Sequence, residues 1–432
     1  MIFKNILHTT GTRLLNAVIN LAILLLITNF VGSEGFGKIS LILLDVTVIQ
    51  LFMGLMAGGS LIYFSSRSHV MPLLLVSYLW ILMVTLIFAG IGWIFLMAFP
   101  SVFHLIVPKG FALAILFLAL LNGFMQVHYN LLIGQKRISQ YNLIFVVQIT
   151  LFLTLFLLGL FIFKQTGTEA YVMALFLSWG AGSLSGLYQI LKTLKSFSPA
   201  GWRKITKEML HYGLPTQSAV MLHIGNKRLS FYFLRIFSGL SPLGLYSAGV
   251  QLTEGLRLIG QSISLVQYST ISDSRDKEYA RTLSIRLMKF SLLLTFFALL
   301  VLLIIPENIY QLVFSQDFGI IKTIVLVLTP GVLSLASNTI FSHYFSGVGL
   351  PAVNLRANMV GFVLTVLFAF LLIPRYGIIG AAATASLNYL ASVIYQYIVF
   401  QKQTKTRFSE WLLHKDDVRL FLETVRQRNK TN

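Results

Sequence analysis

Long apolar stretches separated by short polar connections account for most of the chain. An α-helix needs about 20 predominantly apolar residues to cross a bilayer. Twelve stretches of this kind run at 10–31, 39–64, 73–99, 111–133, 141–163, 169–191, 212–236, 243–268, 287–305, 320–346, 354–373 and 378–400. The pattern therefore predicts twelve transmembrane helices joined by short loops.

The composition agrees with this pattern. Hydrophobic residues make up 56% of the 432 residues and charged residues only 11%, whereas soluble domains carry roughly 25% charged residues. So little polar surface cannot cover a globule of this size in water, which argues against a soluble enzyme. Cysteine is absent, so disulfides, iron–sulfur clusters and thiolate zinc sites are excluded. We expect an all-α polytopic membrane protein.

Basic residues are spread unevenly over the predicted connections. With the amino terminus inside, 24 of the 33 Lys and Arg fall on the inner side and 6 on the outer side. Cytoplasmic connections are the ones that carry excess Lys and Arg, so both termini are predicted to be cytoplasmic. The net charge of +19 is thereby explained by the inner flanks, and no nucleic-acid partner is expected.

The two halves of the chain share a weak repeat. A shift of 207 residues places Phe30, Gly32, Gly37 and Ser40 on Phe237, Gly239, Gly244 and Ser247. The predicted parts are a six-helix bundle (1–195), a cytoplasmic linker (196–211), a second six-helix bundle (212–400) and a cytoplasmic tail (401–432). Transporters built from such repeats enclose a central cavity that opens to alternate sides. We expect two pseudosymmetric bundles around a central cavity.

The tail is predicted to be an amphipathic helix on the inner leaflet, where anionic lipids attract it. Its apolar face would carry Phe408, Trp411, Leu412, Val418, Phe421, Leu422 and Val425. Membrane lipids are therefore an expected partner.

Charged residues inside the predicted spans point to the chemistry of the cavity. Lys227 and Arg228 lie midway along the seventh span and Arg257 along the eighth, and each costs roughly 2.5–3.5 kcal/mol at the bilayer centre. Such a cost is tolerated where the cation faces water, a partner or a substrate. Because the acids here are only Glu254 and Asp45, the cavity is predicted to be cationic and suited to an anion.

The repeat places the first and seventh spans opposite each other across the cavity. The predicted lining comprises Lys227, Arg228, Arg257, Arg13, His223, Asn16 and Asn20. Glu254 and Asp45 are the candidates for a coupling ion, either a proton or sodium. Three structural interpretations stay open: Arg13 reaching the inner headgroups, Glu254 paired with Arg257, and Asp45 paired with a cavity cation. No catalytic residue, metal site or other cofactor is expected.

The run from Asn29 to Gly37 (Asn-Phe-Val-Gly-Ser-Glu-Gly-Phe-Gly), the twelve spans and the intramembrane cations give the chain a resemblance to a known family. It resembles the Wzx-type polysaccharide flippases of the multidrug/oligosaccharidyl-lipid/polysaccharide exporter superfamily, which have a MATE-like fold. The resemblance implies a bacterial cytoplasmic-membrane flippase for undecaprenyl-pyrophosphate-linked oligosaccharides of O-antigen, capsule or exopolysaccharide. A polysaccharide polymerase and chain-length proteins would be its partners.

Three other functions remain open. A multidrug antiporter of the same superfamily would favour acidic sites for organic cations, in contrast to the predicted positive cavity. A lipid II flippase would resemble this chain too, although that family usually has fourteen spans. A membrane-embedded glycosyltransferase or polymerase would need catalytic carboxylates outside the membrane, and Glu307 and Asp317 are the candidates.

Overall fold

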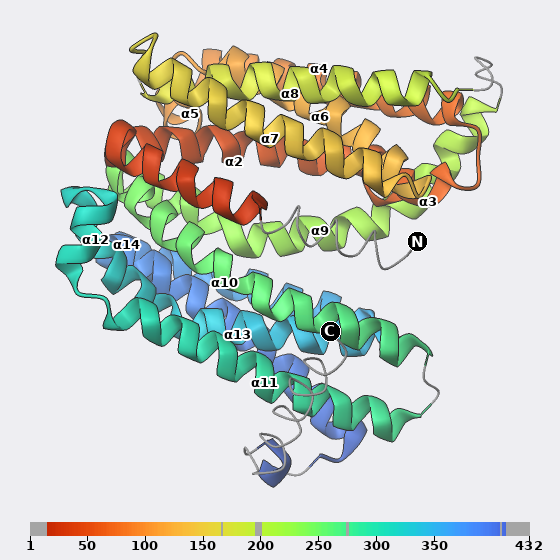
Figure 1. The fold of residues 1–432 in the computed structure, drawn as a ribbon, viewed down its shortest axis with the longest axis vertical. Helices are drawn as coiled ribbons and strands as arrows, with labels where there is room; N and C mark the ends of the chain where they lie inside the picture. Colours follow the sequence, from red (N-terminus) through yellow and green to blue (C-terminus); the bar gives the residue numbers. More distant parts are fainter. Residues whose placement is uncertain (1–14, 166, 195–200, 274–275, 407, 412–432) are drawn as a thin grey trace, which may run out of the picture. The chain divides into compact units, whose positions relative to one another are not determined.

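The computed structural model describes residues 15–165, 167–194, 201–273, 276–406 and 408–411, and the regular structure of these ranges is helical (Figure 1). Eight helical stretches within them are long and apolar enough to cross a membrane. Two of these, Leu15–Ser65 and Ala352–Thr404, each contain two of the predicted spans. The two remaining predictions correspond to helices of 37 and 34 residues that are more polar. The all-helical, multi-pass prediction is confirmed.

The helices follow one another in the order of the predicted spans. After a helix at 15–26, the first half contains η1 (Ile27–Val31), α2 (Gly32–Ala57), α3 (Gly59–Ser65), α4 (Val70–Ala98), α5 (Pro100–Ile106), α6 (Ala112–Gly134), α7 (Ile138–Phe161) and α8 (Gly167–Leu191). The second half contains α9 (Trp202–Ser238), α10 (Leu240–Asp273), α11 (Lys277–Ile304), α12 (Glu307–Phe314), η2 (Gln316–Ile320), α13 (Ile321–Gly347), α14 (Ala352–Thr404) and η3 (Phe408–Trp411).

Glycine interrupts two of the long spans. Gly58 separates α2 from α3, and within α14 Gly377 has a φ of 52° and a ψ of −122°. Residues other than glycine rarely adopt the backbone conformation of Gly377. Gly377 also lies in the gap between the eleventh and twelfth predicted spans, so the kink in α14 marks their boundary.

The helix that contains the seventh predicted span begins before that span. Residues 202–211, part of the predicted linker, form the first turns of α9, and Gly201 with a φ of 83° precedes them. Hydropathy falls at this point because the turns are polar. The backbone bonds of an α-helix do not require apolar side chains, and within α9 no proline precedes Pro215.

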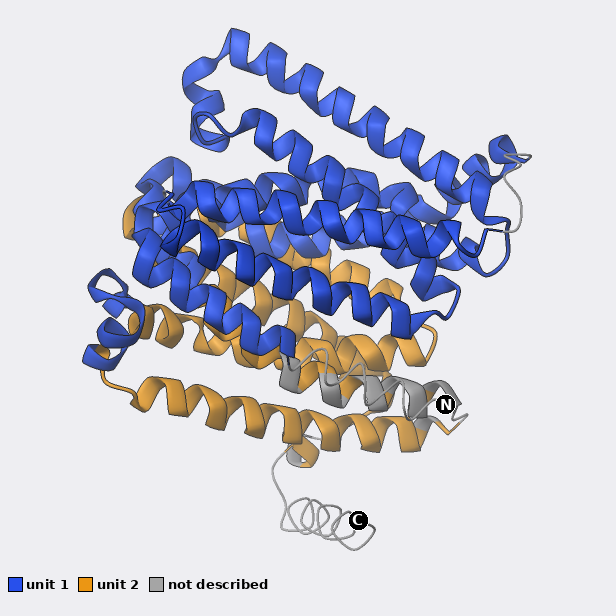
Figure 2. Cartoon of the chain, turned by 45° about the horizontal axis from the view of Figure 1, so that its top comes forward, with its two compact units in different colours: residues 1–248, 308–320 blue, residues 249–307, 321–432 orange. Residues whose placement is uncertain are grey.

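The chain falls into two compact units (Figure 2). Unit 1 comprises residues 1–248 and 308–320, and unit 2 comprises 249–307 and 321–432. Unit 1 therefore contains α9, the start of α10 and the connection between the ninth and tenth spans. The predicted arrangement as two six-helix bundles stays a prediction.

Small residues allow the helices of unit 1 to pack closely. Gly123 of α6 faces Met53 and Ile81, and Gly186 of α8 faces His128. His128 is buried and shares a hydrogen bond with Tyr78 of α4. Close backbone approach at small residues is the usual basis of helix association within membranes, where hydrophobic exclusion does not drive packing.

Within unit 2, an aromatic cluster holds η3 against α13 and α14. Trp411 of η3 lies 6.0 Å from Phe341, 5.4 Å from Tyr397 and 5.7 Å from Phe400, measured between ring centroids. Trp411 was predicted to face lipid with the rest of the tail, but here it packs among aromatic side chains. The remainder of the predicted amphipathic face, from Leu412 onward, lies outside the described residues.

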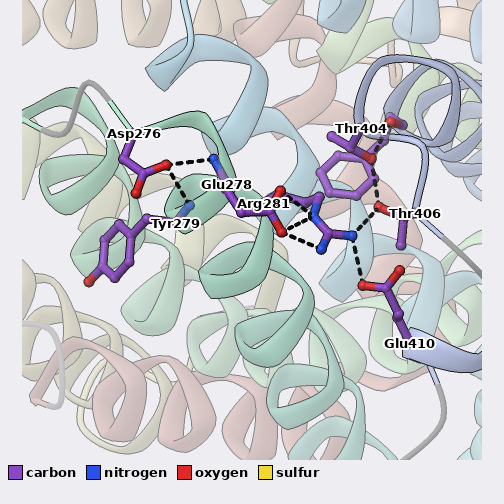
Figure 3. A network of polar contacts seen from close by, with 8 residues as sticks. Asp276, Glu278, Tyr279, Arg281, Thr404, Thr406 and Glu410 are labelled. Atoms are coloured by element: carbon purple, nitrogen blue, oxygen red, sulfur yellow. Dashed lines mark hydrogen bonds and ion pairs between the residues drawn. The ribbon is translucent and has the colours of Figure 1, made fainter.

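Arg281 connects the same segment to α11 (Figure 3). Its Nη1 donates to Glu410 Oε2 at 2.7 Å and to Thr406 Oγ1 at 3.4 Å, while its Nε donates to Glu278 at 3.1 Å. Only 16% of the Arg281 side chain is exposed. The guanidinium therefore fixes the end of α14 and η3 to the first turn of α11.

Candidate functional site

The polar seventh span, α9, carries most of the predicted site that lies in unit 1. His223, Lys227 and Ser230 recur at helical spacing and share one side of α9. The three are at least partly buried, and Ser230 is only 1% exposed. The Arg228 guanidinium lies 5.0 Å from the centre of the Phe231 ring, a cation–π contact. The structure thus places two cations and a histidine within two turns of one helix.

Asp45 of α2 lies in the interior of unit 1 and contacts α9. Its Oδ1 accepts a hydrogen bond from the Tyr232 hydroxyl at 2.6 Å, and Oδ2 is buried without a hydrogen-bond partner. Asp45 is 7% exposed. The expectation left it open whether Asp45 pairs with a cavity cation. In the described structure its partner is a neutral phenol.

Side chains from three helices donate to backbone carbonyls of α2 near its break at Gly58. Gln217 of α9 donates to Leu51 O at 2.7 Å, Trp80 of α4 to Phe52 O at 3.0 Å, and Asn130 of α6 to Ala57 O at 2.7 Å. Two of the acceptors, Leu51 O and Phe52 O, lie within the last two turns of α2, and the third, Ala57 O, is at its last residue. They hold α9, α4 and α6 against the interrupted helix.

The predicted site residues of the first span belong to unit 1, and those of the eighth span belong to unit 2. Asn16 accepts a hydrogen bond from Asn20 at 3.1 Å, and Asn20 is exposed. Arg13 lies outside the described residues. In unit 2, the Arg257 guanidinium donates to the Gln261 amide oxygen, Nε at 3.0 Å and Nη2 at 2.7 Å, when that amide is oriented to accept. Glu254 lies one turn before Arg257 on α10.

Asn130 of α6 and Asn338 of α13 make hydrogen bonds between helices. Asn130 bonds to α2, and in unit 2 Asn338 donates to Gln396 at 3.0 Å. Gln396 in turn donates to Ser342 at 3.2 Å and Asn354 at 3.1 Å. Gln396 is fully buried, so this network is internal to unit 2.

Two functional candidates were missed in the sequence. Tyr232 looks like one aromatic among many, and Gln217 like one more polar residue near a helix end. Both side chains contact α2 because of how α9 packs on it, and no sequence pattern reveals that packing. The described residues hold no group of three or more His, Asp or Glu side chains that could bind a metal ion.

The fold has close counterparts among solved structures. Lipid II flippase MurJ in an inward closed conformation matches with a TM-score of 0.74 at 15% identity, over 95% of this chain and 89% of that one. A multidrug resistance MATE transporter in an inward-facing conformation matches with a TM-score of 0.67 at 15% identity, over 90% and 98%. The chain therefore has the fold shared by MurJ and the MATE transporters. The predicted fold class is confirmed.

The sequence relatives match a smaller part of the chain than the solved structures do. An uncharacterized membrane protein of Methanocaldococcus jannaschii is 24% identical over 49% of this chain and 43% of its own length. Capsular polysaccharide biosynthesis protein CapF of Staphylococcus aureus is 26% identical over 23% and 25%. A probable low-salt glycan biosynthesis flippase of Haloferax volcanii is 22% identical over 37% and 34%. The matches thus span less than half of each curated relative, and no protein-family model matches the chain.

Proposed function

We propose that this protein is a flippase that moves lipid-linked oligosaccharides from the inner to the outer leaflet by alternating access. The observation that carries the proposal is the cationic α9, with His223, Lys227 and Arg228 on a helix of a MurJ- and MATE-like fold. The matched relatives named for capsular polysaccharide biosynthesis and for a glycan flippase support the same class of cargo.

The cargo fits the charge of the site. A pyrophosphate headgroup must cross about 30 Å of hydrocarbon, and Arg and Lys bind phosphate oxygens through charge-assisted hydrogen bonds. Lys227, Arg228 and Arg257 are proposed to load the headgroup on the inner side, with Arg13, Asn16 and Asn20 completing the lining. The lipid tail remains in the bilayer.

The finer proposal concerns the pathway. The carrier is proposed to be undecaprenyl pyrophosphate, and the glycan a repeat unit of O-antigen, capsule or exopolysaccharide. The protein then acts in a bacterial cytoplasmic membrane with both termini inside, beside a polymerase and chain-length proteins. The inner excess of Lys and Arg supports this orientation.

A coupling ion is proposed to reset the cycle, either a proton or sodium at Asp45 or Glu254. Asp45 suits a proton because its buried Oδ2 has no partner and its one hydrogen bond comes from Tyr232. A carboxyl in such surroundings is less costly when it is protonated.

The test is a Lys227→Ala/Arg228→Ala double variant in cells depleted of the native protein. We expect loss of surface polysaccharide with accumulation of lipid-linked oligosaccharide on the inner side. The matched control is Lys204→Ala/Lys207→Ala, which removes the same charge from exposed positions at the start of α9. Full transport by the first variant at normal expression would refute the proposal, and unchanged glycans on depletion would favour a multidrug antiporter.

Lipid II is the second candidate cargo, favoured by the TM-score of 0.74 to MurJ. It carries the same pyrophosphate, so the cationic site suits both cargoes. Depletion distinguishes them, because a lipid II flippase would stop cell-wall synthesis whereas a polysaccharide flippase would remove only the surface polymer.

A further inference from the structure

Three segments far apart in the sequence meet at the first turn of α2. The Ser241 hydroxyl, at the start of α10, donates to Ser33 Oγ at 2.9 Å. Ser33 Oγ donates in turn to Asp317 Oδ2 of η2 at 3.2 Å. All three lie in unit 1, and Ser33 is 8% exposed. Ser33 thus joins the turn between the first and second spans to two segments of the second half.

Segment 308–320 reinforces this junction. It connects the ninth and tenth spans, yet it belongs to unit 1. Asn29 Nδ2 donates to Val313 O at 2.8 Å, and Ser315 Oγ donates to Thr28 O at 3.0 Å. Ser315 has a φ of 74°, which L-residues rarely adopt, so its bond to Thr28 accompanies an unfavourable backbone conformation. Phe318 of the same segment is fully buried.

Two glycines bring the same helices into direct backbone contact. Gly37 packs on the carbonyl of Leu240, and Gly244 packs on the carbonyl of Ser33. The shift of 207 residues that relates the halves places Gly37 on Gly244 and Ser33 on Leu240. The two contacts are therefore pseudosymmetric images of each other. Neither leaves room for a Cβ atom.

We infer that Ser33, Gly37, Ser241, Gly244 and Asp317 form an outer latch, with segment 308–320 as its strap. The latch closes the end of the helices that is predicted to face outside and must open before cargo leaves there. Asp317 and Asn29 are exposed, so water can replace their bonds when the latch opens. The inference rests on the proposed transport cycle and adds the contacts that close its outer side.

A disulfide tests the latch, because the chain contains no cysteine. The Ser33 and Ser241 side-chain oxygens are 2.9 Å apart, so a Ser33→Cys/Ser241→Cys pair should oxidise readily. We expect the oxidised protein to lose transport about tenfold or more and a reductant to restore it. Failure of the pair to oxidise, or transport by the oxidised protein at the parent rate, would overturn the inference.

The control pair is Ser346→Cys/Asn354→Cys, which joins the successive helices α13 and α14 of unit 2. The Asn354 Nδ2 and Ser346 Oγ atoms are 3.2 Å apart, so the two side chains are in contact. Oxidation of this pair should leave transport unchanged, because both residues flank one short turn. Equal inhibition by both disulfides would show a general effect of cross-linking and would overturn the assignment of the latch.

A second measurement needs no cargo. The Ser230→Cys variant places a thiol on α9 that a membrane-impermeant maleimide can label from outside. In this background, Asp317→Ala should raise the labelling rate about fivefold, because the loss of one hydrogen bond increases the open population by about that factor. Glu307→Ala, an exposed acid of the same connection, should leave the rate unchanged. An unchanged rate in Asp317→Ala would overturn the latch. If the labelling result holds while the parent moves no lipid-linked glycan, the latch stands and the proposed cargo fails.

Discussion

A carboxyl group in the middle of a membrane helix must be neutral, paired or hydrated. Asp45 is 7% exposed, accepts a single hydrogen bond, from Tyr232, and has a buried second oxygen without a partner. On α9, Arg228 and Arg235 lie one turn to either side of Tyr232. Arg228 contacts the Phe231 ring and Arg235 donates to the His104 carbonyl. The surroundings of Asp45 therefore favour its neutral form.

Substitution at Asp45 tests the proton assignment. Asp45→Asn keeps the shape but cannot release a proton, so transport should no longer respond to an imposed proton gradient. Tyr232→Phe removes the hydrogen bond while leaving the acid, so the response should persist. The measurement is lipid-linked glycan flipping in vesicles with and without a pH difference. A gradient response in Asp45→Asn that disappears in Glu254→Gln would assign the coupling ion to Glu254 instead.

The glycine contacts make a prediction about stability. Gly37→Ala and Gly244→Ala each direct a methyl group into a backbone carbonyl, so each should destabilise the purified protein by about 1–3 kcal/mol. Gly180→Ala in α8 has open space around the added atom and should be neutral or slightly stabilising. Thermal unfolding in detergent distinguishes the two classes. Equal melting temperatures for all three variants would contradict the close packing.

At the scale of elements, one arginine holds the described residues that follow α14. Arg281 of α11 bonds to Glu410, Thr406 and Glu278, and Trp411 packs against the aromatic cluster of unit 2. Hydrogen bonds to charged groups contribute about 1.5–3 kcal/mol. The segment after α14 is therefore part of the folded unit as far as Trp411.

Arg281→Ala should lower the stability of the protein by about 1–3 kcal/mol, because it leaves Glu410 and Thr406 without this donor. The matched variant is Arg286→Ala, which removes an exposed charge from the same helix and should have little effect. Thermal unfolding together with limited proteolysis after residue 404 provides the measurement. Identical cleavage rates in both variants would show that Arg281 does not hold the segment.

α9 shows how an element can be partly hidden in the sequence. Its apolar part predicts a span at 212–236, whereas the helix runs from Trp202 to Ser238. The added turns at its start are polar, with Arg203, Lys204 and Lys207 exposed. Hydropathy detects burial in lipid, but helix ends are set by backbone bonds and by residues such as Gly201 and Gly239, both with positive φ.

At the scale of the whole molecule, the fold alone does not decide the cargo. The same architecture is found in a lipid II flippase and in a multidrug resistance transporter, each 15% identical to this chain, and one fold can host several functions. Charge inside the spans is what separates these classes. The proposal of an anionic headgroup rests on His223, Lys227 and Arg228 of α9, set against Asp45 of α2.

The sequence by itself determined the membrane class, the positions of the spans and the cations within them. The length of an apolar stretch and the charges within it are local properties, and a stretch that crosses lipid must form a helix to satisfy its backbone hydrogen bonds. Only the tertiary structure decided which distant residues meet. The bond between Tyr232 and Asp45, the junction of Ser33 with Ser241 and Asp317, and the packing of Trp411 all join segments more than 60 residues apart. Such contacts depend on helix register and rotation, which hydropathy does not encode.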